Sequence, residues 1–206
     1  MSPAPQKVTD DDVFAATQRA MMRYGPQELT LAHIAAEAGV TAGRLVQRFG
    51  SKRGLLLALS NRFGSGGSEL FAALRRDARS PLAALRSYAA CMAGLASSPD
   101  AMARNLAYLQ IDLTDPEFRA NLLANARETR RQLESMVRNA VAAGELLDTT
   151  PVRQLARTVE TVVSGALMTW ACYQEGTADR WLSREVEAVL EPYLPVPNRQ
   201  VRRPRR

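Results

Sequence analysis

The sequence predicts an all-α fold of about nine helices. Apolar residues recur at helical spacing through most of the 206 residues. No segment alternates apolar and polar residues with the period of two that is typical of a strand. Ser, Thr, Pro and Gly stand where helices are expected to begin and end. No repeat of solenoid length is present, so helices packed on helices are the expected architecture.

The first helix is expected over residues 10–24. Thr9 and Asp12 have the spacing of a capping box, with Asp in place of the usual Glu or Gln. An amphipathic pattern follows, and Gly25-Pro26 is expected to end the helix because Pro removes a backbone donor.

Two short helices are expected next. Thr30 can cap the second helix, and Gly39 can adopt the left-handed conformation that ends it. Thr41 can cap a third helix after a turn of about two residues. Two helices joined by such a tight turn form a helix-turn-helix unit.

Later boundaries follow from Ser51, from prolines and from Gly144. Ser51 can cap a fourth helix, but GSGGS at residues 64–68 is expected to kink or break it, since each Gly costs up to about 1 kcal/mol. Five further helices are expected over residues 81–96, 101–111, 116–143, 151–175 and 179–193.

The charge distribution is more informative than the net charge. Five arginines within residues 199–206 supply most of the formal charge of +6, leaving +1 for the rest of the chain. No acidic residue lies between Glu37 and Glu69. That window holds five basic residues, Arg44, Arg48, Lys52, Arg53 and Arg62. A local basic patch is therefore expected.

Composition places the chain among globular proteins of the cytoplasm. It is 46% apolar and 23% charged, without an apolar run near the roughly 18 to 20 residues of a membrane span. The N-terminus lacks the apolar core of a secretory signal. Cys91 and Cys172 lie in apolar patterns far apart in the sequence, which indicates buried thiols in a reducing cytoplasm.

The third expected helix has two sorted faces. At about 100° per residue, Leu45 and Phe49 share one face, while Arg44 and Gln47 share the other. Arg can pair with guanine and Gln with adenine, whereas Lys and capping N–H groups suit phosphate. The predicted DNA contacts are Thr30, Thr41, Ala42, Gly43, Arg44, Gln47, Arg48 and Lys52. Arg48 fits either a base or a phosphate.

The segment LTLAHIAAEAGVTAGRLVQRFGSKRGLL, residues 29–56, resembles the DNA-binding signature of the TetR family of bacterial transcriptional regulators. The matching positions are Thr30, the run IAAEAGV at residues 34–40, Gly43, Leu45, Phe49 and Ser51-Lys52. The sequence also departs from the signature. Val46 stands where the family commonly has a Tyr that contacts phosphate, Arg44 replaces a small hydroxyl residue, and Arg48 replaces Tyr or His.

The resemblance implies a ligand-responsive repressor that binds a (pseudo)palindromic double-stranded operator as a homodimer through its last two helices. It also implies release by a small, largely apolar effector. The domains are then expected at residues 1–55 (DNA binding) and 56–194 (ligand binding and dimerisation), with a disordered basic tail at 195–206. Candidate ligand contacts are Tyr88, Cys91, Met92, Tyr108, Phe118, Met168 and Tyr173. Each of these can equally be plain core.

One alternative stays open. Because Val46 cannot donate a side-chain hydrogen bond, the chain could instead be a helical small-molecule or protein-binding module with lost or only nonspecific DNA binding.

Catalytic, metal and cofactor sites are not expected. His33 is the only histidine and has no evident partners for a catalytic triad. One His and two distant Cys match no zinc-ligand spacing, and GSGGS lacks the Lys-Ser/Thr ending of a phosphate-binding loop. His33 is expected to face the surface or a phosphate.

Overall fold

The computed structural model describes residues 8–94 and 98–196, apart from the side chains of residues 63–67. Within these ranges the chain is helical and contains no strand. The helices are α1 (Asp10–Glu28), α2 (Leu31–Ala38), α3 (Ala42–Phe49), α4 (Lys52–Asp77), α5 (Pro81–Ala93), α6 (Pro99–Thr114), α7 (Pro116–Ala142), α8 (Val152–Tyr173), α9 (Ala178–Leu190) and the short 3-10 turn η1 (Glu191–Tyr193). The all-α prediction is confirmed.

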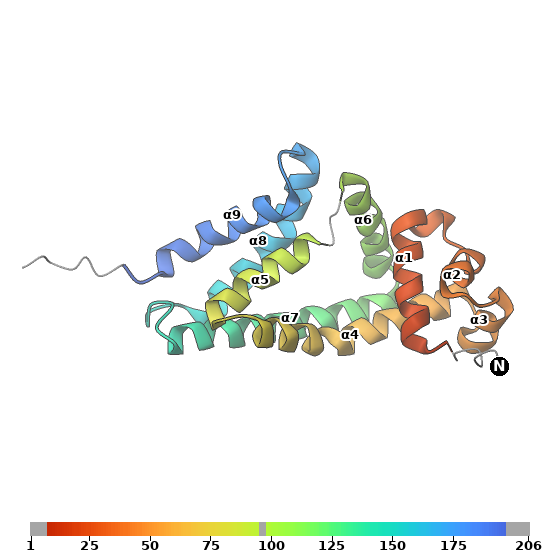
Figure 1. The fold of residues 1–206 in the computed structure, drawn as a ribbon, viewed down its shortest axis with the longest axis horizontal. Coiled ribbons are helices and arrows are strands. Elements are labelled where there is room, and N and C mark those ends of the chain that lie inside the picture. Colours follow the sequence, from red (N-terminus) through yellow and green to blue (C-terminus); the bar gives the residue numbers. More distant parts are fainter. Residues whose placement is uncertain (1–7, 95–97, 197–206) are drawn as a thin grey trace, which may run out of the picture.

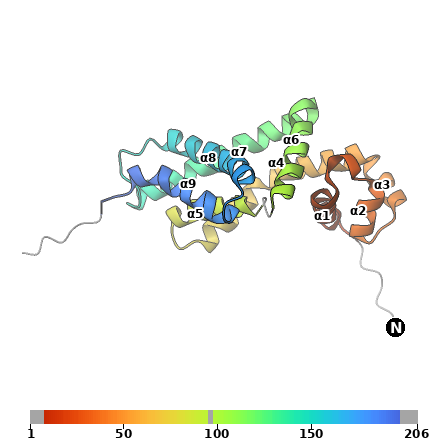
Figure 2. The same cartoon turned by 90° about the horizontal axis from the view of Figure 1, so that it is seen from above.

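The molecule is elongated. Helices α1, α2 and α3 gather at one end, and α5, α8 and α9 lie toward the other (Figure 1, Figure 2). The two longest helices, α4 and α7, pack side by side and join the two ends. Helix α6 stands between α1 and the rest of the bundle and contacts both α1 and α7.

Helix α1 begins as predicted but ends later. The Thr9 hydroxyl accepts a hydrogen bond from the Asp12 N–H at 3.2 Å, and the Asp12 carboxylate accepts one from the Thr9 N–H at 2.9 Å. This capping box lowers the pKa of Asp12. Gly25 (φ 69°) leaves helical geometry, yet the chain resumes a helical turn to Glu28. Gly25-Pro26 therefore makes a kink rather than an end.

The helix-turn-helix unit forms as the sequence predicts. The Thr30 hydroxyl accepts from the His33 N–H at 3.2 Å, and the Thr41 hydroxyl accepts from the Arg44 N–H at 3.3 Å. Gly39 ends α2 in the left-handed conformation with φ 66°. Each of these contacts spans three residues or fewer, so local sequence is enough to specify them.

The expected break in α4 is wrong. Helix α4 is continuous from Lys52 to Asp77, and GSGGS lies inside it. The physical reason is tertiary: α4 packs against α7 over much of its length. Because most helix stability in proteins comes from packing, this contact offsets the low helix propensity of three glycines.

Two apolar clusters form the core, one toward each end of the molecule. The cluster at the end formed by α1, α2 and α3 contains Val13, Ala20, Leu29, Ile34, Ala35, Leu45 and Leu55. The larger cluster is built from α4 through α9 and centres on fully buried residues such as Leu85, Leu133, Leu155 and Leu182. Two cavities lie where α1 meets the rest of the bundle, one walled by α1, α4, α6 and α7 and the other by α1, α4, α5 and α7.

The cysteines and His33 differ from what the sequence predicts, and most of the predicted C-terminal tail is not among the described residues. Cys91 is half-buried but Cys172 is exposed, because α8 turns that side outward; both thiols are free. His33 stacks on Tyr24 with ring centroids 3.9 Å apart rather than facing outward alone. Residues 197–206, most of the predicted basic tail, lie outside the described residues.

Candidate nucleic-acid interface and effector cavities

Helix α3 lies at the end of the molecule (Figure 1), and most of its polar residues are exposed. Leu45 is 1% exposed and anchors the inner face, and Phe14 and Phe49 pack beside it with ring centroids 6.0 Å apart. Thr41, Gly43, Arg44, Gln47 and Arg48 are exposed, and Ala42 is half-buried. This sorting follows from the apolar spacing, which allows only one face of so short a helix to be buried.

Arg44 and Gln47 are exposed on α3, and their side chains are suited to base recognition. Among the described residues neither side chain has a hydrogen-bond or ion-pair partner, so both can reach an external acceptor. Gly43 next to them has open space where a Cβ would lie, so backbone can approach a ligand there. Base recognition by Arg44 and Gln47 stays a prediction.

The basic window of the sequence is largely neutralised in the structure. Arg48 forms an ion pair with Asp10 and donates to the Val8 carbonyl at 3.1 Å. Arg53 pairs with Asp115 at 2.8 Å. Further pairs are Arg53 with Glu117, Arg62 with Asp11 and Arg62 with Glu69. The acids come from α1, α4 and the start of α7. A sequence window without acidic residues can therefore lie beside acidic residues in the folded protein.

Lys52 also has an internal role. Its ammonium donates to the Leu29 carbonyl at 2.8 Å and to the Pro26 carbonyl at 3.4 Å. It thereby satisfies carbonyls at the end of α1, which have no helical partner. Two of its three N–H donors are used in these bonds, so one is left for a phosphate. Thr30 is exposed but its hydroxyl is occupied as the α2 cap.

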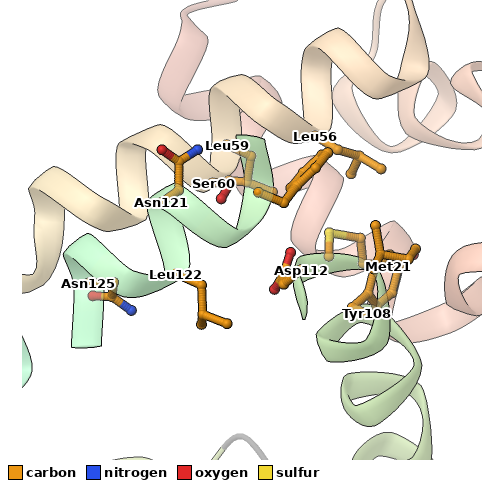
Figure 3. Close-up of a pocket in the computed structure, with 11 residues that line it drawn as sticks. Met21, Leu56, Leu59, Ser60, Tyr108, Asp112, Asn121, Leu122 and Asn125 are labelled. Carbon is orange, nitrogen blue, oxygen red and sulfur yellow. The ribbon is translucent and has the colours of Figure 1, made fainter. Parts of the chain in front are cut away.

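A cavity of about 200 Å³ lies between α1, α4, α6 and α7 (Figure 3). Its lining residues are Met21, Leu56, Leu59, Ser60, Tyr108, Ile111, Asp112, Phe118, Asn121, Leu122 and Asn125. The wall is mostly apolar. The Tyr108 hydroxyl and the Asn121 Nδ2 are buried and have no hydrogen-bond partner among the described residues. Burial raises the pKa of Tyr108 and that of Asp112.

A second cavity of about 620 Å³ is bounded by α1, α4, α5 and α7. It shares Leu59 and Asn125 with the first, so the two cavities have a common wall. Apolar side chains including Phe71 and Met92 line it, with charged groups such as Arg62. Burial raises the pKa of Tyr88 to about 12, so its phenol stays protonated and can donate.

The predicted ligand contacts divide into three groups. Tyr88, Cys91 and Met92 line the larger cavity, and Tyr108 and Phe118 line the smaller one. Met168 and Tyr173 line neither: they are 51% and 65% exposed on the outer side of α8. Helical periodicity does not reveal which side of α8 is covered, because that depends on where its neighbours α7 and α9 lie.

Sequence reasoning missed three polar residues of the smaller cavity. Asp112, Asn121 and Ser60 were not singled out, although each stands in an apolar helical pattern. Such an interruption was the available signal, and it does not distinguish a solvent-facing residue from one that faces a cavity. Only the packing of α6 on α1 and α7, with α4 forming another wall of the cavity, decides this.

Within the described ranges, no helix is long and apolar enough to cross a membrane. Nor do three or more His, Cys, Asp or Glu side chains gather there in a way that could hold a metal ion.

A capped helix-turn-helix with an exposed Arg and Gln, joined to a helical bundle that contains cavities, defines a helical DNA-binding regulator. The family described as "Bacterial regulatory proteins, tetR family" matches residues 13–59, and "Tetracyclin repressor-like, C-terminal domain" matches residues 105–186. Together these matches span more than half of the chain. The protein belongs to the TetR family of transcriptional regulators.

Solved structures share the fold along nearly the whole chain. A TetR regulator from Haloarcula marismortui is 17% identical, with a TM-score of 0.73 over 90% of this chain and 98% of that one. SmeT, the repressor of a Stenotrophomonas maltophilia multidrug efflux pump, is 21% identical, with a TM-score of 0.65 over 92% of each chain.

FadR from Bacillus subtilis, solved in complex with stearoyl-CoA, is 16% identical, with a TM-score of 0.64 over 88% of this chain and 98% of that one. No curated protein matches the sequence. At these identities the structural likeness shows the fold alone.

Proposed function

We propose that the protein is a ligand-responsive repressor that binds a (pseudo)palindromic operator as a homodimer and is released by a small, largely apolar molecule. One combination of features carries the proposal. The outer face of α3 exposes Arg44 and Gln47, which have no partner among the described residues, and α1 and α4, which support α3, also wall a cavity. We also propose the division into residues 1–55 and 56–194. Repression is the family's usual mode.

Direct base recognition would come from α3. Arg44 can donate two hydrogen bonds to guanine, and Gln47 can bond adenine. Backbone N–H groups at the Thr41 cap and the exposed Gly43 suit the phosphates that fix the register of the helix on DNA. Lys52 can add a phosphate contact through its third N–H donor, and Arg48 can add one if it leaves Asp10.

Coupling would run through the junction of α4, α6 and α7. The cavity wall includes Met21 of α1 and Leu56 of α4, so a ligand there contacts helices that support α3. Arg53, next to α3, pairs with Asp115 and lies over the Phe118 ring at 5.6 Å. Phe118 lines the same cavity. In a dimer, the two α3 helices must lie ~34 Å apart to enter successive major grooves. A ligand that binds more tightly to a conformation with a different spacing therefore lowers DNA affinity.

Dimerisation through α8 and α9 has a candidate surface. Thr161, Gly165, Met168 and Cys172 form one exposed stripe along α8. Gly165 has open space where a Cβ would lie, so a second helix can approach there. We expect Met168→Arg to lower the dimer fraction in sedimentation velocity. Leu113→Arg on α6 is the matched control, since Leu113 is 53% exposed and Met168 is 51% exposed.

The test of the whole proposal is DNA binding across a salt series. DNA from upstream of the protein's own gene and of its divergent neighbour is compared with unrelated DNA of equal length. We expect tight, selective binding at about 0.15 M salt. Equal and salt-labile binding to both DNAs would contradict operator recognition and favour the module with nonspecific DNA binding, as the exposed Val46 on α3 allows.

A further inference from the structure

The smaller cavity holds a carboxylate without a partner. Asp112 lies on α6 and is the only charged side chain among the residues that line the cavity. Figure 3 shows its carboxylate directed from α6 into the gap toward α7. Among the described residues it forms no ion pair and its side chain accepts no hydrogen bond, and burial alone accounts for the shift of its pKa.

Asp115, three residues further on, shows the contrasting case. Its carboxylate pairs with Arg53 at 2.8 Å and caps α7 by accepting from the Glu117 N–H at 3.0 Å. Arg53 therefore lowers the pKa of Asp115, whereas burial raises that of Asp112. The two carboxylates lie on adjacent turns, so the difference comes from the partners that each meets. The available position for a counter-ion of Asp112 is therefore inside the cavity.

We propose that this cavity binds a small amphipathic organic cation, with Asp112 as the counter-ion of its ammonium group and the apolar wall around its hydrocarbon part. The identification of the cavity as an effector site rests on the proposed function; the charge of the ligand rests on Asp112. Desolvating a carboxylate is unfavourable unless it is paired, and a bound cation supplies that pair.

The rest of the wall fits the same ligand class. The aromatic rings of Tyr108 and Phe118 line the cavity, and ring faces attract cations. Ser60 and the amide of Asn121 supply neutral polar contacts. No Arg, Lys or His lines the cavity, so an anionic headgroup would meet only the like charge of Asp112. The cavity therefore selects against carboxylate and phosphate ligands.

The experiment is isothermal titration of the full-length protein with matched probes. The cations are phenethylammonium and hexyltrimethylammonium; phenethyl alcohol is the neutral probe and phenylacetate the anionic one. We expect at least one cation to bind about ten- to hundredfold more tightly than phenethyl alcohol, and phenylacetate to bind least. Equal affinity for cation and alcohol, tightest binding of phenylacetate, or no binding of either cation overturns the proposal.

Variants assign the effect to Asp112. In Asp112→Asn the preferred cation is expected to lose about ten- to hundredfold in affinity, while phenethyl alcohol is unchanged. Asp112→Glu should keep the preference for a cation. Asp100→Asn, an exposed acid on the same helix, should change neither. Circular dichroism checks the fold of each variant. Unchanged cation binding in folded Asp112→Asn also overturns the proposal.

A separate readout distinguishes this inference from the proposed function. Release of upstream DNA is followed by fluorescence anisotropy with the same probes. Cation binding that depends on Asp112 but leaves the DNA bound supports the ligand class and contradicts its role as effector. Release of the DNA by a neutral or anionic probe, unaffected by Asp112→Asn, supports the repressor and contradicts the ligand class.

Discussion

The outer face of α3 and the cavity between α1, α4, α6 and α7 each present a charge that no described residue neutralises. Arg44 on α3 is exposed, so water solvates its guanidinium and an absent partner has little energetic cost. Asp112 is half-buried, and its raised pKa reports the cost of desolvation. An unpaired surface charge is thus compatible with many partners, whereas an unpaired charge in an apolar cavity indicates one kind of ligand.

The arginines around α3 show a second contrast. Arg48 and Arg53 are held by acids from α1 and α7, whereas Arg44 has no such partner. The acids neutralise charge near the DNA-binding end and tie that end to the rest of the molecule. Specificity is therefore expected to depend on few side chains, and nonspecific attraction to DNA should be weaker than the basic window alone indicates.

The largest expected effect separates the two faces of α3 itself. Leu45→Ala should destabilise the DNA-binding end by about 2–5 kcal/mol, because Leu45 is 1% exposed and its loss leaves a cavity. Val46→Ala, one residue further on and 46% exposed, should change stability by less than about 0.5 kcal/mol. Urea denaturation monitored by circular dichroism measures both. Equal losses would mean that α3 is not anchored through Leu45.

The next effect tests whether Arg44 recognises bases. Arg44→Ala should weaken binding to the selected DNA by about 1–3 kcal/mol, because it removes a guanine contact, and should leave scrambled DNA nearly unaffected. Fluorescence anisotropy with both DNAs measures the difference. A uniform loss for both sequences would assign Arg44 to phosphate instead.

A smaller effect tests the neutralised arginines. Asp10→Asn removes the acid that pairs with Arg48 and should free its guanidinium for a phosphate. The slope of log affinity against log salt should then steepen by about one unit for any DNA sequence. Asp77→Asn, whose acid pairs with Arg76 at the far end of α4, is the control. An unchanged slope would show that Arg48 does not reach DNA.

The smallest effect concerns Asp112 and pH. Because its pKa in the folded state is raised above 3.8, the folded protein holds this proton more tightly than the unfolded chain. The protonated carboxyl therefore contributes fully to folding stability below pH 3.8, the pKa in the unfolded chain. This contribution to stability is lost as pH rises through the raised pKa of the folded state. Relative to Asp112→Asn, the wild type should lose under about 1 kcal/mol between pH 3 and pH 7, since the group is only half-buried.

Urea denaturation of both proteins at several pH values measures this difference. A wild type that gains stability relative to Asp112→Asn as pH rises would mean that a cationic side chain pairs with Asp112. The proposed cavity chemistry would then lose its basis.

The sequence by itself determined the all-α class, the points where α1, α2 and α3 begin, and the DNA-binding unit. The caps at Thr9, Thr30 and Thr41 and the turn at Gly39 depend on contacts within a few residues, so the pattern of residues is sufficient. The family follows from the same local signature, because residues 13–59 carry it.

Only the tertiary structure decided how α4 passes through GSGGS, which arginines are neutralised, and which polar residues face a cavity. In the sequence, Met168 and Asp112 each lie within an apolar helical pattern. In the structure, Met168 lies on the outer side of α8, whereas Asp112 lines a cavity. Each of these outcomes depends on groups brought together from distant parts of the chain, as when Arg53 meets Asp115. Local propensity carries no information about such pairs, because their energies arise from packing and charge across helices.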